Sequence, residues 1–239
     1  MNILITGGAS GLGEAITTAA ALAFPQAIVY FTYHSSGQNA TAIQDKYSNT
    51  HALKCDFTNQ QDMDTICSFI EKKGIDILVN NAIAGLSQQY FHKMEKKEFA
   101  EGFTNNVLPV MAITKSFIKT ARKIKSGKII TILSSAIINT APTGWSAYVA
   151  EKNYLLAMHR SWATENAAFN ITSNCISPGF MATHLNNNTD DRIVEDMIAK
   201  HPLKKLVTPA EVAVVALFLI NASSQVNGNN IIINSSLSI

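Results

Sequence analysis

The chain carries little charge and has no long apolar stretch, and these two shortages exclude several classes of protein. Charged residues make up 15% of its 239 residues and the formal net charge is +2, so we expect no nucleic-acid-binding or membrane-binding surface. No apolar run approaches the roughly 20 residues that a transmembrane helix needs. The amino terminus lacks the basic and apolar segments of a signal peptide. We therefore expect a cytoplasmic protein.

Cysteine is scarce as well. Cys55, Cys67 and Cys175 have neither an even count nor the spacing of metal ligands, which argues against a disulfide framework and against a metal site. We expect three free thiols that act as small buried hydrophobic residues in a reducing compartment. No repeat, long linker or low-complexity tract divides the sequence either, so we expect one domain over residues 1–239.

Strand-like and helix-like segments alternate along the chain. This alternation predicts a doubly wound α/β fold with about seven parallel strands and helices on both faces. The strand candidates are residues 2–6, 27–33, 51–55, 76–80, 128–134, 171–177 and 230–234. Helical patterns cover residues 14–24, 37–47, 60–73 and 146–166, and a capping signal at Thr208 begins another. Residues 93–125 fit one long helix kinked at Pro109 or two helices, and the polar segment 180–202 is expected to form a mobile lid with a short helix.

A glycine-rich turn joins the first strand to the first helix. Its sequence is Gly7-Gly8-Ala9-Ser10-Gly11-Leu12-Gly13. A turn in this position aims free backbone N–H groups and the helix dipole at a phosphate. An ordinary tight turn also uses glycine, but three glycines at a strand-to-helix junction favour the binding of a dinucleotide.

The second strand lacks the acidic residue that usually binds the ribose 2′-hydroxyl of NAD. It ends instead in Tyr33-His34-Ser35-Ser36. Hydroxyl and imidazole donors suit a 2′-phosphate, so NADP(H) is favoured and NAD(H) is the alternative. A polar loop that contacts nothing is the other interpretation of His34.

A tyrosine and a lysine four residues apart predict an acid/base centre. In the helix expected over residues 146–166, Tyr148 and Lys152 share one face, where the ammonium is expected to lower the pKa of the phenol. A tyrosine of this kind can act as an acid near neutral pH. Ser135 follows a buried strand, at the edge where open α/β sheets bind ligands. An incidental surface pair is the alternative interpretation of Tyr148 and Lys152.

Several further polar residues have two interpretations each. Asp56 follows the third strand, where it can accept from an adenine amino group or cap the next helix. Asn80 and Asn81 either let the cofactor approach or form a turn. Asn106, near Pro109, is a candidate water-binding residue in a proton relay, or a packing residue at a kink.

The order and spacing of these motifs resemble those of the short-chain dehydrogenases/reductases over essentially the whole chain. The matching segments are Thr6-Gly7-x-x-x-Gly11-x-Gly13, Asn80-Asn81-Ala82, Ser135, Tyr148-x-x-x-Lys152 and Pro178-Gly179. The resemblance implies a Rossmann fold and an oxidoreductase that transfers a hydride between NADP(H) and a carbonyl or alcohol substrate. It also implies a homodimer or homotetramer, assembled through the helices at about 103–125 and 146–166.

The resemblance further implies a role for each matching residue. Tyr148 would be the acid/base and Ser135 would hold the substrate oxygen by a hydrogen bond. Lys152 would bind the nicotinamide ribose and lower the pKa of the tyrosine, and Asn106 would anchor the water that links this lysine to solvent. The implied cofactor contacts are Gly7, Ser10, Gly11, Leu12, Gly13, Tyr33, His34, Ser35, Asp56 (adenine), Phe57, Asn81 (adenosine ribose), Ala82, Tyr148, Lys152, Pro178, Gly179 and Thr183 (nicotinamide carboxamide).

The sequence departs from the family pattern at two places. Ile83 stands where the motif Asn-Asn-Ala usually continues with glycine, and Ser235-Ser236 stands where a pair of glycines often follows the last strand. The first change is expected to reshape the wall near the adenine and ribose. The second leaves the packing of the tail open.

The segment at residues 33–36 is similar to the Tyr-Arg-Ser-Ser of NADPH-dependent 3-oxoacyl-carrier-protein reductases, with His34 in the arginine position. An acyl thioester is therefore one substrate hypothesis, and Arg122, Lys123 and Lys125 are candidates for a basic entrance to the site. They would otherwise only solvate a helix end. The alternative functions are an NAD(H)-dependent alcohol dehydrogenase and a non-catalytic nucleotide-binding regulator. Retention of both Tyr148 and Lys152 argues against the regulator.

Overall fold

One parallel sheet runs through the protein. The computed structural model describes residues 1–138, 140–183 and 190–237, and within them seven strands pair in the order β3-β2-β1-β4-β5-β6-β7. Every neighbouring pair is parallel, so the predicted doubly wound fold is confirmed. The strands are β1 (Asn2–Ile5), β2 (Ile28–Tyr33), β3 (Thr50–Lys54), β4 (Ile77–Asn80), β5 (Gly127–Ile132), β6 (Ile171–Pro178) and β7 (Asn230–Ile233).

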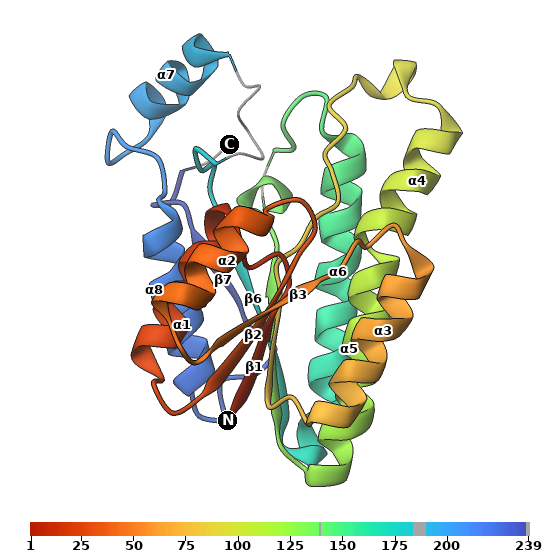
Figure 1. Ribbon diagram of the computed structural model, residues 1–239. Helices are drawn as coiled ribbons and strands as arrows, with labels where there is room; N and C mark the ends of the chain where they lie inside the picture. Colours follow the sequence, from red (N-terminus) through yellow and green to blue (C-terminus); the bar gives the residue numbers. More distant parts are fainter. Residues whose placement is uncertain (139, 184–189, 238–239) are drawn as a thin grey trace.

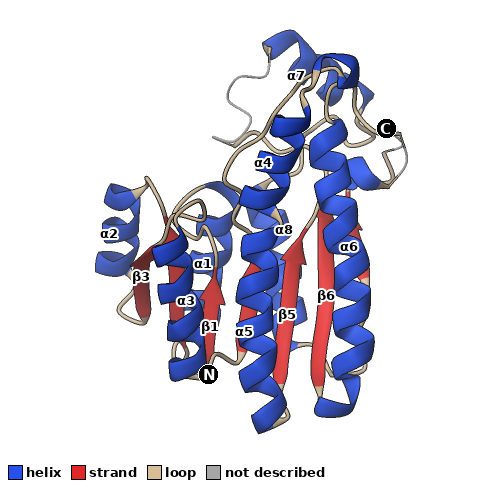
Figure 2. Ribbon diagram, turned by 90° about the vertical axis from the view of Figure 1, so that its right-hand side faces the viewer, coloured by secondary structure: helices blue, strands red, loops and turns tan. Residues whose placement is uncertain are grey.

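Helices cover both faces of this sheet, as Figures 1 and 2 show. One face carries α1 (Gly11–Ala23), α2 (Gly37–Lys46) and α8 (Pro209–Asn221). The other carries α3 (Gln60–Lys73), α4 (Lys96–Asn106), α5 (Leu108–Ile124) and α6 (Ser146–Asn166). The remaining α-helix, α7 (Asp191–Lys200), lies beyond the carboxyl edge of the sheet (Figure 1). None of the helices in the described ranges is both long and apolar enough to cross a membrane.

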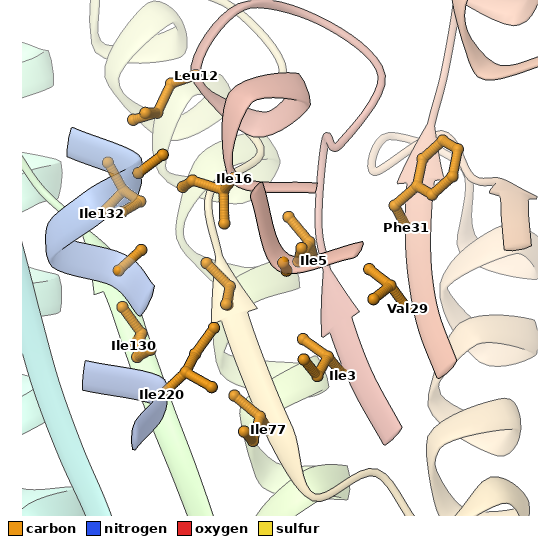
Figure 3. Packing of buried hydrophobic residues seen from close by; sticks show 14 of the residues in the cluster. Ile3, Ile5, Leu12, Ile16, Val29, Phe31, Ile77, Ile130, Ile132 and Ile220 are labelled. Carbon is orange, nitrogen blue, oxygen red and sulfur yellow. The ribbon is translucent and has the colours of Figure 1, made fainter. Parts of the chain in front are cut away.

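Each strand sends alternate side chains into one of two cores. Ile3 and Ile5 of β1 pack with Ile16 of α1 beneath α1 and α8, as Figure 3 shows. Leu4, between them in sequence, points to the opposite core with Phe117 of α5. All five side chains are fully buried, and each such burial contributes about 1.5–3 kcal/mol. A sheet held from both faces fixes the positions of the loops at its carboxyl edge.

Local capping explains where two helices begin. The Thr208 hydroxyl accepts from the Glu211 backbone N–H, the Glu211 carboxylate accepts from Thr208, and the predicted cap is thereby confirmed. Helix α3 is capped by Asn59, whose side chain accepts from the Asp62 N–H. The expectation that Asp56 caps this helix is therefore wrong. Its carboxylate accepts instead from the backbone and hydroxyl of Thr58, at 2.8 Å each.

Proline separates two helices rather than bending one. Helix α4 ends at Asn106, α5 begins at Leu108, and Pro109 lies in the first turn of α5. A first-turn residue has no intrahelical partner for its N–H group, so proline costs little there. Of the two alternatives for residues 93–125, the structure has two helices, and the kink expected at Pro109 is not present.

The serines that replace the family's paired glycines adopt the backbone conformation that glycine favours. Ser235 has a φ of 52° and Ser236 a φ of 59°, both in the left-handed region. A side chain in this region is disfavoured relative to glycine because its Cβ approaches the carbonyl oxygen. The tail thus keeps a glycine-like path at the end of β7 although it carries serine.

A buried histidine makes the stability of the fold depend on pH. His159 of α6 is 0% exposed, its Nδ1 lies 3.0 Å from the Ser173 hydroxyl, and burial lowers its pKa from 6.5 to about 4. Between these two values the unfolded chain binds a proton that the folded chain excludes. Stability is therefore expected to fall as pH drops from 6.5 towards 4, by about 3 kcal/mol in total.

Denaturant unfolding of the wild type and of His159→Gln across this pH range measures how much of the loss of stability is due to His159. Other groups contribute equally to both proteins, so the difference between the two slopes isolates His159. Equal slopes would show that the imidazole is protonated in the folded state.

Candidate active site

A cleft of about 1450 Å³ opens along the carboxyl edge of the sheet. The loops that follow β1, β2, β3, β4, β5 and β6 all contribute to its wall, as expected for a parallel sheet whose strands end at one edge. Every residue named from the sequence as a cofactor contact lines this cleft, and so do Ser135, Tyr148 and Lys152. Asn106 does not, and lies behind Lys152 beside a second, small cavity.

The glycine turn is compact because side chains are absent where the backbone closes on itself. Gly7 and Gly11 have φ values of 65° and 52°. A Cβ on Gly13 would overlap the carbonyl oxygen of Gly7, so α1 begins directly against the end of β1. The Gly7 N–H donates to the Thr32 hydroxyl at 2.9 Å. This geometry brings the amino terminus of α1 to the cleft, where it suits a phosphate group.

Asn81 ties the loop after β4 to the glycine turn. Its amide donates to the carbonyl of Thr6 at 2.9 Å, and the Thr6 hydroxyl accepts from the N–H groups of Asn81 and Ala82. The turn-forming interpretation of Asn81 is thus visible in the structure, while the side chain also lines the cleft. The two interpretations are compatible.

The pocket beyond β2 presents a histidine beside a carboxylate. His34 Nε2 lies 3.4 Å from Asp56 Oδ2, and Tyr33, Ser35 and Ser36 line the same part of the cleft. Hydrogen bonds from Thr58 lower the pKa of Asp56, so this carboxylate is charged at neutral pH. A cationic side chain at position 34 therefore has a nearby counter-ion.

Tyr148 faces the cleft from the first turn of α6. The ring of Trp145 meets it edge-to-face at 5.4 Å between centroids. Burial raises the pKa of Tyr148, and a hydrogen bond with the Ser134 hydroxyl opposes this. The phenol accordingly keeps its proton at neutral pH and is available as an acid. Ser135, the residue after Ser134, is 4% exposed and lines the cleft together with Tyr148.

The expectation that Lys152 lowers the pKa of Tyr148 is not met. The Lys152 ammonium lies 5.7 Å from the centroid of the tyrosine ring and donates to the carbonyl of Ile132 at 2.9 Å. Burial lowers the pKa of the lysine itself to about 8, and the neighbouring Glu151 carboxyl opposes that shift. Desolvation of the phenol outweighs a cation at this distance.

Two residues beside the catalytic candidates escaped the sequence analysis. Ser134 ends the segment predicted as the fifth strand, and its hydroxyl contacts Tyr148. Glu151, which is 8% exposed, packs against Asn106 behind the cleft. One signal for Glu151 was available, because it lies four residues from Ala147 and four from Leu155, both of them apolar and buried.

Helix α7 closes one side of the cleft. Ile193, Met197 and Lys200 contribute to its lining. The structure thus has the short helix expected within the lid segment 180–202, whereas residues 184–189 of that segment lie outside the described part of the chain.

The three basic residues considered for the entrance of the site lie elsewhere. Arg122 and Lys123 end α5 and Lys125 follows it, directly before the amino end of β5. This end of α5 lies at the edge of the sheet where the strands begin (Figure 2), whereas the loops that line the cleft follow the ends of the strands. The Arg122 guanidinium packs on the Phe169 ring at 4.0 Å. These residues therefore do not form the basic entrance, because a parallel crossover returns its helix to the start of the next strand.

Comparison with known proteins agrees with this geometry. A family model described as enoyl-(acyl carrier protein) reductase matches residues 7–237. The 3-oxoacyl-[acyl-carrier-protein] reductase FabG of Buchnera aphidicola subsp. Baizongia pistaciae is 32% identical, over 98% of this chain and 96% of its own. FabG of Thermotoga maritima is 31% identical, again over 98% of this chain and 96% of its own.

Solved structures are similar over the same extent. A protein of Beutenbergia cavernae, provisionally assigned as an NAD(P)-dependent gluconate 5-dehydrogenase and crystallised with NADP at low occupancy, superposes with a TM-score of 0.89. It is 25% identical and the alignment covers 99% of this chain and 96% of that one. The glycine turn, the Ser135, Tyr148 and Lys152 constellation and these matches lead to one conclusion: the chain belongs to the short-chain dehydrogenase/reductase family and is an NAD(P)-dependent oxidoreductase.

Proposed function

We propose that this protein is an NADP(H)-dependent carbonyl reductase in which Tyr148 donates the proton. The observation that carries the proposal is the meeting of Ser135, Tyr148 and Lys152 in the cleft that the glycine turn also lines. NADPH, when bound, supplies the hydride. A protonated phenol beside the substrate oxygen supplies the matching proton, and the Ser135 hydroxyl holds that oxygen in place.

The other residues bind and orient the cofactor. The glycine turn with Ser10 and Leu12 would bind the pyrophosphate, and Asp56 and Phe57 would contact the adenine. Lys152 and Asn81 would bind the two ribose groups. The segment from Pro178, the last residue of β6, to Thr183 would hold the nicotinamide, and Thr183 lies next to Gly11 of the glycine turn.

The substrate class that we propose is a 3-oxoacyl thioester. The relatives named FabG support it, and so does the similarity of residues 33–36 to the reductases of that type. Residues without a proposed cofactor contact, Trp145 and Met197 among them, also line the cleft. A second candidate is the oxidation of a sugar-acid alcohol, which the similarity to the gluconate 5-dehydrogenase structure favours.

Activity assays separate these functions. The purified protein would be assayed for NADPH oxidation with 3-oxoacyl thioesters, simple ketones and aldehydes, and for reduction of NADP⁺ and NAD⁺ with gluconate. Turnover of thioesters well above that of gluconate is the expected result. Binding of NADPH without turnover across the whole panel would support a nucleotide-binding regulator instead.

Replacement of His34 by arginine is expected to increase the preference for NADPH over NADH by about tenfold. A guanidinium is always charged and binds phosphate through two parallel hydrogen bonds, whereas the imidazole lacks this paired donor geometry and lies 3.4 Å from Asp56. Fluorescence titration of the wild type and of His34→Arg with both nucleotides measures the ratio. His92→Arg, on an exposed residue outside the cleft lining, is the matched control. An unchanged ratio would place the 2′-phosphate away from residue 34.

We also propose that the chain acts as one domain over residues 1–239, in the cytoplasm, as a homodimer or homotetramer. Helices α5 and α6 lie side by side on one face of the sheet, where a second copy can pack against them (Figure 2). Leu108 and Tyr154 are exposed there, at 45% and 38%. Light scattering of the purified protein gives the oligomeric state directly, and a monomer would contradict this part of the proposal.

A further inference from the structure

A buried glutamate lies directly behind the lysine of the active site. Glu151 and Lys152 are each 8% exposed, and the Lys152 ammonium is fixed by its bond to Ile132 at the end of β5. Burial of a carboxyl group is costly unless it is hydrogen-bonded or paired with a cation. Glu151 therefore needs a hydrogen-bond donor or a cation nearby, and its surroundings provide one.

Asn106 binds the glutamate side chain. Its amide nitrogen donates to Glu151 Oε2 at 3.0 Å and to the carbonyl of Gly85 at 3.1 Å, and its oxygen accepts from the Ala84 N–H at 2.9 Å. The side chain predicted to hold a relay water thus links the loop after β4 to the carboxyl group. On the side of Lys152 where Asn106 lies, the neighbouring charged group is Glu151.

Helix α4 leaves space for the carboxyl group. A Cβ on Gly102 would clash with Glu151 Oε1, so any larger residue at that position would displace the glutamate. Glu151 is 8% exposed, and α4 and α6 contact each other here. The carboxyl group therefore lies against α4, and the residue lines the same small cavity as Lys152.

A small cavity with both polar and apolar lining residues lies between the two residues and the sheet. Its volume is about 10 Å³, which is room for about one water molecule. Glu151, Lys152, Asn80 and Thr131 all line it. Among the described residues, Asn80 Oδ1 and Thr131 Oγ1 are buried without a hydrogen-bond partner. A cavity of this size with such lining atoms suits one water that hydrogen-bonds to them.

We propose that Glu151 is the positioning residue that holds Lys152 protonated and passes protons from solvent to it through this cavity. The inference rests on the proposed function, in which Tyr148 gives one proton to the substrate in each reduction. The Lys152 ammonium then gives a proton to the tyrosinate, Lys152 regains one from the Glu151 carboxyl group, and Glu151 regains one from solvent. One proton enters from solvent for each proton delivered, so the sequence balances.

The electrostatics of the pair agree with this role. Burial raises the pKa of Glu151, whereas Asn106 and Lys152 lower it, and the pKa of Lys152 lies at about 8. Burial therefore brings the pKa values of the two groups closer together, which favours proton transfer between them. Of the described residues, the other titratable groups that act on this pair are Tyr148 on α6 and Cys175 on β6, and burial raises the pKa of each. β4, β5 and α4 contribute side chains that do not titrate, at Asn80, Thr131 and Asn106.

Glu151→Gln is the first test. The glutamine keeps the shape and accepts the hydrogen bond from Asn106, but it carries neither charge nor an exchangeable acidic proton. We expect kcat near neutral pH to fall by about tenfold or more, with unchanged NADPH affinity. We also expect the alkaline limb of the kcat profile to move to lower pH by about one unit, because Lys152 loses the carboxylate that favours its charged form. Glu165→Gln, an exposed residue on the same helix, is the matched control.

Glu151→Ala with added acids is the second test, and it separates proton transfer from structure. Formate is expected to restore part of kcat in this variant, whereas formamide, which has a similar shape and no acidic proton, is not. If Glu151→Gln fails to fold, rescue of Glu151→Ala by formate is by itself the test of whether Glu151 transfers protons. Wild-type kcat and an unshifted profile in Glu151→Gln, or equal effects of formate and formamide, would overturn the inference. If the role of Glu151 is overturned in this way but Tyr148→Phe still loses turnover, the proposed function is unaffected. Full activity of Tyr148→Phe would instead contradict the proposed function itself.

Discussion

Replacing Tyr148 with phenylalanine is expected to lower the rate of carbonyl reduction by about 10³-fold while the affinity for NADPH stays within about twofold of wild type. The phenol is held at the cleft by Trp145, and burial keeps it protonated at neutral pH. Phenylalanine preserves the ring and its contact with Trp145 and removes only the acidic proton. Single-turnover kinetics and a nucleotide titration on the same preparation measure the two effects separately.

Tyr154→Phe is the control for this substitution. Tyr154 lies on the same helix, is 38% exposed and meets Phe103 through its ring, so loss of its hydroxyl should leave turnover unchanged. Retention of more than about a tenth of the wild-type rate in Tyr148→Phe would assign the proton to another group. Loss of nucleotide binding together with turnover would show that the ring position, and not the proton, had been disturbed.

Gly13→Ala is expected to weaken NADPH binding by about 100-fold and to lower the free energy of unfolding by about 2 kcal/mol. The added Cβ would overlap the carbonyl oxygen of Gly7 and crowd the amide of Asn81. Both neighbours are fixed, since Gly7 donates to Thr32 and Asn81 donates to Thr6. The turn must therefore open, which moves the amino terminus of α1 away from the phosphate position. Equilibrium unfolding and a fluorescence titration measure the two losses.

Gly85→Ala is the comparison for this variant. A Cβ on Gly85 meets no atom within 4 Å, and its φ is not in the left-handed region. The substitution should therefore leave the unfolding free energy and the NADPH affinity close to those of the wild type. Wild-type affinity in Gly13→Ala would mean that the close approach of α1 to β1 is not required for binding.

Much of the fold could be predicted because its signals are local. Strand β4 and helix α3 follow from apolar periodicity, and α3 ends where Gly74 adopts a left-handed φ of 65°. The cap at Thr208 is contained within four consecutive residues. The residues that line the cleft were also predictable, because the loops after parallel strands meet at one edge whatever their side chains are.

Other features depended on contacts that local patterns do not contain. The choice between a kink and a break at Pro109 was settled by where the first turn of α5 begins. The position of Arg122 relative to the cleft was settled by the direction in which α5 crosses the sheet. The pKa of Tyr148 depends on how much of the ring the surrounding protein covers, which a spacing of four residues cannot show.

The sequence by itself determined the family, the parallel sheet and the residues that line the cleft, because each is encoded by periodicity or by motifs of a few residues. Tertiary structure alone decided what lies behind Lys152. Glu151 meets Asn106 across 45 residues of chain, opposite the space that Gly102 leaves, and beside a cavity lined by β4 and β5. Whether a glutamate is a solvated surface residue or a buried proton carrier depends on desolvation and on distant partners. Those quantities exist only once the helices have packed on the sheet.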